Sequence, residues 1–380
     1  MTPLEQNWKG DNVMGSGTWL SGWAKRIKLD LDYTNKIGAS VSWFPVTIFL
    51  KAGNGDTTKV FNEVGANYKK IAVTKADAIS ELKVEVEWWD SIAQVGVLHC
   101  SKSDWTINAD TSIYIYYDNT HADNPNVGDK GSAAGQAVWD NYFTAVWHLD
   151  EATGAARNDS KGSNNLTNYN NAAQIDGKVG KATNFIAANK TYLHIADNAA
   201  VSMGDIDFTI ELRFKIASET GDYQNPFRKD NASGNREYMF TRIKAGAANA
   251  KKIIYGIPAG TTGTTSVTYE VGTWYDVVFY HDATNDVMGV RTNVDTLDTK
   301  AISGGFPDKA APFVMGIGLY AGGKEYFDGI IDEFRISKNI VRSLAWIKGT
   351  YNTLWDALLT YGSEKTRTPG IVTLFNKGFN

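Results

Sequence analysis

Cysteine, proline and long apolar runs are scarce in this 380-residue chain, and each scarcity excludes something. Cys100 is the only cysteine, so no disulfide can form within the chain, and its apolar neighbours Val97 and Leu98 predict a buried side chain rather than a reactive thiol. No apolar stretch approaches the ~20 residues that cross a bilayer, so we expect no membrane insertion. Residues 1–17 contain no basic start followed by an apolar run, so no secretory signal is predicted.

Long runs of one charge are missing as well. The formal charge of −4 is spread along the chain, without the basic patch that would attract a phosphate backbone or an anionic membrane surface. We therefore expect no nucleic-acid partner.

Sequence signatures of catalysis are also absent. There is no Gly-x-Ser-x-Gly elbow and no Cys–His arrangement, and the strands of the second half lack the alternating acids of a retaining glycosidase. No two histidines are spaced i, i+2 or i, i+4 on one element, so we expect no zinc site, and His148 is expected to be a packed strand residue. The expectation is a protein that is not an enzyme. The histidines are His99, His121, His148, His194 and His281.

What the chain does contain favours β-structure. Aromatic residues make up 12% of it and glycine contributes 36 residues, a balance that suits pleated sheets joined by glycine turns. Between Lys25 and Tyr33 apolar residues alternate with polar ones, which predicts a strand with one face on a core. Near the end, Ser343 is a suitable N-cap for a short helix whose apolar residues recur from Leu344 to Leu354.

A polar, aperiodic segment, Asp118–Gln136, divides two series of predicted strands, and the length of the chain suits two domains. The predicted organisation is an N-terminal arm (1–20), a first β-sandwich (21–137), a second β-sandwich (138–362) and a C-terminal tail (363–380).

Several motifs of the second half resemble bacterial and viral laminin-G-like domains. They are AVWHLDE (Ala145–Glu151), GKVGKATNF (Gly177–Phe185), FTIELRFKI (Phe208–Ile216), VGTWYDVVFYHD (Val271–Asp282) and FDGIIDEFRISKNIVRS (Phe327–Ser343). The first half, with EVEWWD (Glu85–Asp90) and IYIYY (Ile113–Tyr117), resembles a domain of unknown function that often precedes laminin-G-like domains in prokaryotic surface proteins and phage proteins.

The resemblance implies an all-β fold of two jelly-roll-like β-sandwich domains, the second of the concanavalin A or laminin-G type, with a short C-terminal helix. It also implies a tendency to bind glycans, such as cell-surface polysaccharide, or proteins. Our hypothesis is a non-catalytic phage protein on the virion surface, such as a tail fibre, tail-tip or capsid-decoration component, that contacts other virion structural proteins and forms a homo-oligomer or part of a larger assembly. The alternative is a secreted or cell-surface carbohydrate-binding adhesion module of a prokaryote, which would be extracellular.

Calcium is the cofactor that the resemblance implies, since carboxylates and backbone carbonyls suit a hard cation. Asp332 and the Asp150–Glu151 turn can approach one another if the first and last strands of the second domain are neighbours. The alternative is that Asp332 and Glu333 pair with Arg335 or accept backbone hydrogen bonds.

Candidate glycan ligands lie in two predicted exposed segments. Gly221–Glu237 is polar and long enough to be a functional loop, although a protein contact or plain solvated surface is the alternative there, and two tyrosines flank a second, glycine-containing turn. In the first half, Glu85, Glu87 and Asp90 alternate, and we expect them to form a solvated strand face. The predicted ligand-binding residues are Tyr223, Arg228, Asp230, Asn231, Asn235, Tyr320 and Tyr326.

Overall fold

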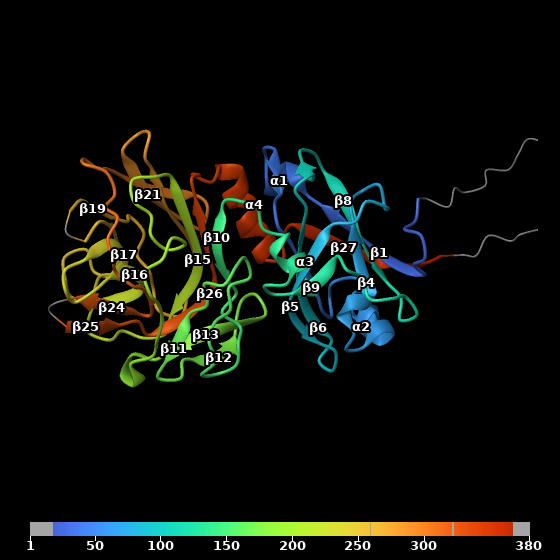
Figure 1. Cartoon of the computed structure of the whole chain (residues 1–380), viewed down its shortest axis with the longest axis horizontal. Coiled ribbons are helices and arrows are strands. Elements are labelled where there is room, and N and C mark those ends of the chain that lie inside the picture. The colour runs from blue at the N-terminus through green and yellow to red at the C-terminus, as the bar shows by residue number, and fades with distance from the viewer. Residues whose placement is uncertain (1–17, 259, 321–322, 368–380) are drawn as a thin grey trace, which may run out of the picture.

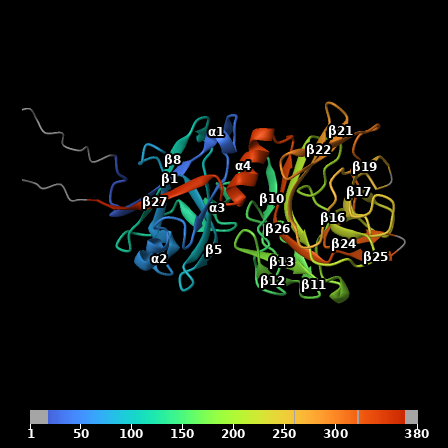
Figure 2. The ribbon, with the colours of Figure 1, turned by 180° about the vertical axis from the view of Figure 1, so that it is seen from behind.

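The computed structural model describes residues 18–258, 260–320 and 323–367, and most of their regular structure is β-strand (Figure 1). The larger sheets, numbered I to IV here, stack as two sandwiches, with IV, III, II and I following from left to right in Figure 1 and in reverse order in Figure 2. The predicted all-β class with two sandwiches and a short C-terminal helix is confirmed. No helix in the described ranges is long and apolar enough to span a membrane.

The first sandwich consists of sheet I (order β27-β1-β8-β4) and sheet II (order β3-β6-β5-β9). The alternation predicted around Lys25–Tyr33 is real, because Ile27, Leu29 and Leu31 all face the core between these sheets. The strands are β1 (Lys25–Leu31), β2 (Val41–Ser42), β3 (Val46–Leu50), β4 (Ile71–Thr74), β5 (Lys83–Asp90), β6 (Val95–Ser101), β7 (Thr106–Ile107), β8 (Thr111–Tyr117), β9 (Val127–Asp129) and β27 (Leu359–Thr366). Short helices are α1 (Tyr33–Lys36), α2 (Thr58–Val64), η1 (Tyr68–Lys70) and α3 (Ala133–Gln136).

The second sandwich consists of sheet III (order β12-β13-β26-β15-β20-β21-β22, with β10 also on β26) and sheet IV (order β11-β14-β23-β16-β17-β18-β19). Its core is rich in aromatic rings such as Trp147, Phe227 and Phe334. The strands are β10 (Phe143–Trp147), β11 (Thr167–Tyr169), β12 (Ala173–Asp176), β13 (Lys181–Phe185), β14 (Tyr192–Ile195), β15 (Phe208–Ile216), β16 (Gln224–Asp230), β17 (Arg236–Arg242), β18 (Ile253–Gly256), β19 (Thr262–Thr264), β20 (Trp274–Asp282), β21 (Val287–Thr292), β22 (Thr296–Ala301), β23 (Phe313–Met315) and β26 (Gly329–Lys338), with helix η2 (Ala187–Asn189). A hairpin of β24 (Ile317–Tyr320) and β25 (Gly323–Tyr326) packs against β16.

After the second sandwich the chain returns to the first. Helix α4 (Leu344–Leu354) lies between the two sandwiches (Figures 1 and 2), and its predicted cap is present, since the Ser343 hydroxyl accepts a hydrogen bond from the Trp346 amide at 3.2 Å. Trp346 then packs edge-on against Phe44, with ring centroids 5.0 Å apart. Strand β27 follows and pairs antiparallel with β1, so segments near the beginning and the end of the described chain lie side by side in sheet I.

One predicted loop is wrong. Most of Gly221–Glu237 is not an exposed insertion, because Gln224–Asp230 forms the buried strand β16 between β23 and β17 in sheet IV. Phe227 points into the core, and the β24–β25 hairpin covers the other face of the strand. The charged residues of this strand made its sequence resemble a loop. In the fold, buried ion pairs satisfy these charges. The exposed remainder consists of residues 221–222 and a tight turn at 231–235.

The sandwiches meet through the outer faces of sheets II and III. Phe49 and Val97 of sheet II contact Val179 and Leu354 there, which gives the interface an apolar part. Next to it lies a buried group of charged and polar side chains.

Candidate functional site

Charged residues reach the interface from β5 because of strand alternation and a β-bulge. Val84 and Val86 face the core of the first sandwich, so Glu85 and Glu87 point the other way, toward sheet III. The register with β6 shifts between Val86 and Trp88, which leaves Glu87 as the extra residue of a bulge. A bulge of this kind re-aims a side chain, and it is often found next to functional sites.

A second bulge does the same in β26. Ile331 and Phe334 both face the core of the second sandwich, although only one of them could do so in a regular strand. Glu333 between them has φ 54°, in the left-handed region that a non-glycine residue seldom adopts. This conformation allows Asp332 and Glu333 to leave the core together and face sheet II.

Four side chains from both sandwiches converge at this point: Glu87, His99, His148 and Glu333, here called the interface cluster. Each is fully buried, and one ligand atom from each lies within 4.8 Å of the others. His148 Nδ1 is 2.5 Å from Glu333 Oε1 and 3.4 Å from Glu87 Oε2, and His99 Nε2 is 2.6 Å from the same Glu87 oxygen. The two imidazole rings stack with centroids 4.8 Å apart.

The outward nitrogens of both histidines have partners as well. His148 Nε2 lies 2.7 Å from Glu85 Oε1, and His99 Nδ1 lies 3.0 Å from the Thr47 hydroxyl. Glu85 also accepts a hydrogen bond from the Trp139 indole at 3.2 Å, and Arg335 forms an ion pair with the second oxygen of Glu333. These contacts fix the orientation of the rings.

Burial and neighbouring charge shift the pKa values of the cluster in opposite directions. Burial raises the pKa of Glu87 well above its usual range, and the nearby Glu333 carboxylate adds to that effect. Burial alone would lower the pKa of His148, but Glu333 and Glu87 outweigh it and hold that pKa well above the usual value. Burial, with the charge of His148, holds the pKa of His99 well below its usual value. The pKa values of the two stacked imidazoles are therefore shifted in opposite directions.

One expectation about these residues is wrong and another is confirmed. The alternating acids Glu85 and Glu87 do not form a solvated strand face, because both are buried. His148 is packed, as expected, and its ring contacts the acidic side chains of Glu85 and Glu333. The spacing of the histidines in the sequence could not predict the interface cluster. Its four residues come from separate parts of the sequence, and only the contact between the sandwiches brings them together.

The residues predicted to bind calcium have partners of their own. Strands β10 and β26 are neighbours, as that prediction required. Asp332 Oδ2, however, accepts hydrogen bonds from the amides of Lys178 and Val179 at 2.7 and 2.9 Å, and Asp150 pairs with Lys130. Glu151 Oε1 accepts from the amide of Asn158 at 2.9 Å. Calcium binding by these three residues stays a prediction.

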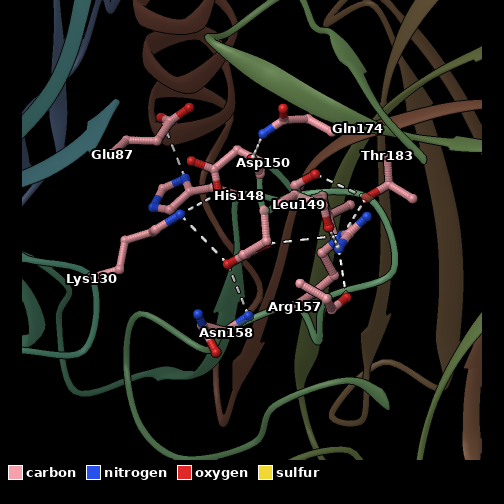
Figure 3. A network of polar contacts seen from close by, with 12 residues as sticks. Glu87, Lys130, His148, Leu149, Asp150, Arg157, Asn158, Gln174 and Thr183 are labelled. Atoms are coloured by element: carbon pink, nitrogen blue, oxygen red, sulfur yellow. Dashed lines mark hydrogen bonds and ion pairs between the residues drawn. The ribbon is translucent and has the colours of Figure 1, made fainter. Parts of the chain in front are cut away.

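Arg157 organises the adjoining loop, as Figure 3 shows together with Asp150 and Lys130. Its fully buried guanidinium donates to the Thr183 hydroxyl at 2.6 Å and to the carbonyl of Ala155 at 2.6 Å. It also reaches the carbonyls of Ala152 and Ala172, both at 3.2 Å. The positively charged Arg157 guanidinium thus donates hydrogen bonds to the backbone carbonyl oxygens of this loop.

The predicted glycan ligands are divided between buried and accessible positions. Arg228 and Asp230 are buried and joined by an ion pair of 2.8 Å, so neither is on an exposed loop. The Asn231 side chain accepts hydrogen bonds from two amides of the turn at 231–235, and Asn235 is exposed there. Tyr223 is half-buried beneath the Lys244 ammonium, Tyr326 is half-buried on β25, and the side chain of Tyr320 lies outside the described residues.

An aromatic surface that the sequence did not indicate lies on the outer face of sheet IV. Leu193 of β14 faces the core, so Tyr192 and His194 face outward. Tyr169, which is 38% exposed, stacks on Tyr192 with ring centroids 4.6 Å apart and an interplanar angle of 1°. Burial, then the nearby phenols of Tyr169 and Tyr326, raises the pKa of Tyr192. Tyr169, Tyr192, His194 and Tyr326 are called the aromatic surface below.

A pocket between α4 and sheet III leads toward the interface cluster. Its volume is about 30 Å³, and its lining extends from Tyr351 and Arg291 to Arg335 and Glu333.

Residues 187–348 match a laminin-G family model described as the concanavalin A-like lectin/glucanases superfamily, so this span carries a domain of that superfamily. No curated protein matches the chain.

Several solved structures are similar in fold. The binding domain of Paraclostridial Mosquitocidal Protein 1 has 13% identity and a TM-score of 0.45, over 56% of this chain and 52% of that one. Domain 4 of AbnA, a GH43 extracellular arabinanase from Geobacillus stearothermophilus, in complex with arabinotriose, has 19% identity and a TM-score of 0.43, over 57% and 98%. The binding domain of botulinum neurotoxin serotype C1 has 11% identity and a TM-score of 0.42, over 56% and 52%. The chain thus spans about half the length of the two toxin domains.

Proposed function

We propose that this protein is a non-catalytic, glycan-binding surface protein and that the aromatic surface is where the sugar binds. The observation that carries the proposal is the flat, outward-facing stack of Tyr169 on Tyr192, with Tyr326 nearby, in and beside a domain of the concanavalin A-like lectin/glucanases superfamily.

The chemistry of this surface suits a sugar ring. A pyranose has an apolar face of C–H groups and a rim of hydroxyls, and a phenol offers it both an apolar ring and a polar tip. Polar groups border the stack, because the exposed Asn170 follows Tyr169 and its side chain donates to the carbonyl of the exposed Lys190 at 2.8 Å.

Burial of the interface cluster supports a role without catalysis. Glycoside hydrolysis needs two carboxyl groups on either side of a bound sugar. Glu87 and Glu333 come close together, but both are fully enclosed between the sandwiches, where no sugar chain fits.

The place of action that we propose is the virion surface of a phage, as part of a tail fibre, a tail tip or a capsid decoration. It rests on the resemblance of the first half to domains that precede laminin-G-like domains in phage and prokaryotic surface proteins. Mass spectrometry of purified particles should find the protein among the structural components. Its absence from particles, with presence on the cell surface or in the medium, would instead support a prokaryotic adhesion module.

Binding is tested on a glycan array with the full chain, followed by calorimetric titration of the best glycan. The double variant Tyr169→Ala/Tyr192→Ala should lose affinity on the order of tenfold, which corresponds to ~1.4 kcal/mol and is typical of a lost aromatic contact. Tyr142→Ala is the matched control, since that tyrosine is 44% exposed and lies outside the aromatic surface. It should bind as the wild type does.

Two results would contradict the proposal. If the wild type binds no glycan, or if the control loses as much affinity as the double variant, the aromatic surface is not a sugar site. Release of reducing sugar from a polysaccharide panel would overturn the non-catalytic part.

A further inference from the structure

The donor atoms of the interface cluster form a set that suits a transition-metal ion. Two imidazole nitrogens and two carboxylate oxygens are the ligands that zinc commonly takes at four-coordinate sites. With metal–ligand bonds of about 2.0–2.1 Å, a tetrahedral site places its donors about 3.4 Å apart. The 3.4 Å between His148 Nδ1 and Glu87 Oε2 already equals this. The closer pairs need to open by less than about 1 Å, and the wider pairs, none above 4.8 Å, need to close.

The residues that hydrogen-bond to the histidines of the cluster are of the kind found around metal ligands. A metal-bound histidine usually donates its other ring N–H to a carboxylate, a carbonyl or another acceptor, which fixes its tautomer. His148 Nε2 has Glu85 in this position, at 2.7 Å, and His99 Nδ1 has the Thr47 hydroxyl, at 3.0 Å. Both rings therefore turn their remaining nitrogen toward the same point between the sandwiches.

A second observation concerns one carboxylate oxygen of the cluster. Glu87 Oε1 is buried and has no hydrogen-bond partner among the residues that the structure describes. It lies against Gly180, where an added Cβ would come within 2.9 Å of it, so the second sandwich leaves room for this carboxylate. A buried carboxylate oxygen without a partner is costly, and a bound cation would satisfy it.

The contacts of the cluster are also rich in acidic groups. Glu85 and Glu87 from the first sandwich and Glu333 from the second all contact His148. Buried acidic groups are tolerated in proteins when they are paired or coordinate a metal.

We propose that the interface cluster is a structural site for one divalent metal ion of the zinc class, ligated by Glu87, His99, His148 and Glu333. Four protein ligands and complete burial describe a closed site, which holds parts of a fold together rather than offering an open position for chemistry. Glu87 and His99 come from the first sandwich, and His148 and Glu333 from the second, so the ion links the two.

The test uses the full chain, unfolded in denaturant with a chelator and refolded with or without Zn²⁺. The refolded protein should retain about one zinc per chain after dialysis, and its Tm should rise by about 5–10 °C over the metal-free protein, as expected for a ligand bound well above its dissociation constant. Refolding with Co²⁺ should produce the visible absorption bands of a tetrahedral cobalt site.

Variants locate the ion. Glu87→Gln and His99→Gln each remove one ligand, and each should reduce retained zinc at least tenfold and abolish the rise in Tm. His121→Gln is the matched control, because His121 stacks on Trp23 in the first sandwich, away from the cluster, and it should retain zinc as the wild type does. Should a ligand variant fail to fold, the cobalt spectrum of the wild type decides by itself.

Three outcomes would overturn the proposal. They are a wild type that retains no zinc, shows no change in Tm and has no tetrahedral cobalt spectrum; folded ligand variants that still retain zinc; and stabilisation by Ca²⁺ but not by Zn²⁺, which would indicate an oxygen-only site elsewhere.

Discussion

Asp230 and Arg228 show how a charged residue that looks like a surface ligand in the sequence becomes part of the interior. Their ion pair of 2.8 Å lies beneath the β24–β25 hairpin, and the amide of Leu319 donates to Asp230 at 3.2 Å. Burial nevertheless dominates, and it raises the pKa of Asp230 to about 6, although Arg228 acts in the opposite direction.

This pKa predicts a pH dependence of stability. Because the folded-state pKa of Asp230 lies above the unfolded value, the folded protein holds this proton more tightly, and its contribution to stability is complete below about pH 4 and is lost as the pH rises through about 6. The full contribution is on the order of 3 kcal/mol. Urea unfolding at pH 4 and pH 6 should therefore show a smaller difference for Asp230→Asn than for the wild type. An unchanged difference would mean that Asp230 does not titrate in this window.

Individual residues were predictable from the sequence where alternation was regular, and not where it was broken. The core positions Ile27, Leu29 and Leu31 follow from period two alone. Glu87 and Glu333 do not, because each is the extra residue of a bulge, and a bulge depends on the register with a neighbouring strand. The interface cluster could therefore not be predicted from the sequence, because it depends on two such bulges and on the contact between the two sandwiches.

At the level of elements, helix α4 matters because it fills the space between the sandwiches. Local signals were sufficient to predict it, since a capping serine precedes residues with helical spacing. Strand β16 was missed for the opposite reason: its sequence, QNPFRKD, is polar, and only its partners in sheet IV and the covering hairpin make it a buried strand. Tertiary context overrides local propensity in such a strand.

The cap of α4 can be tested directly. Ser343→Ala should lower the free energy of unfolding by about 1 kcal/mol, because it removes the acceptor for the Trp346 amide at an exposed position. Ser343→Asp is the control, since aspartate caps as well as serine does, and it should leave stability nearly unchanged in urea unfolding. Equal losses in both variants would show that the hydroxyl does not act as a cap.

At the scale of the whole molecule, the two sandwiches are not independent folding units. The first one needs α4 and β27, which follow the second in sequence, and the interface between them buries apolar as well as charged groups. We expect heat to unfold the protein in one cooperative transition, with equal calorimetric and van't Hoff enthalpies. Two resolved transitions would show that the interface couples the sandwiches only weakly.

The pairing of β1 with β27 also determines how the molecule responds to pulling. Lys25 lies opposite Thr366, and the amide of Arg367 donates to the carbonyl of Ala24 at 2.8 Å, so the described chain leaves sheet I through two adjacent strands, at the opposite pole from sheet IV (Figure 1). Tension between the two ends would unzip this antiparallel pair one hydrogen bond at a time, at low force. If both ends are anchored together and the load is taken at sheet IV, the force instead crosses every sheet in series, and the interface between the sandwiches becomes a mechanical joint.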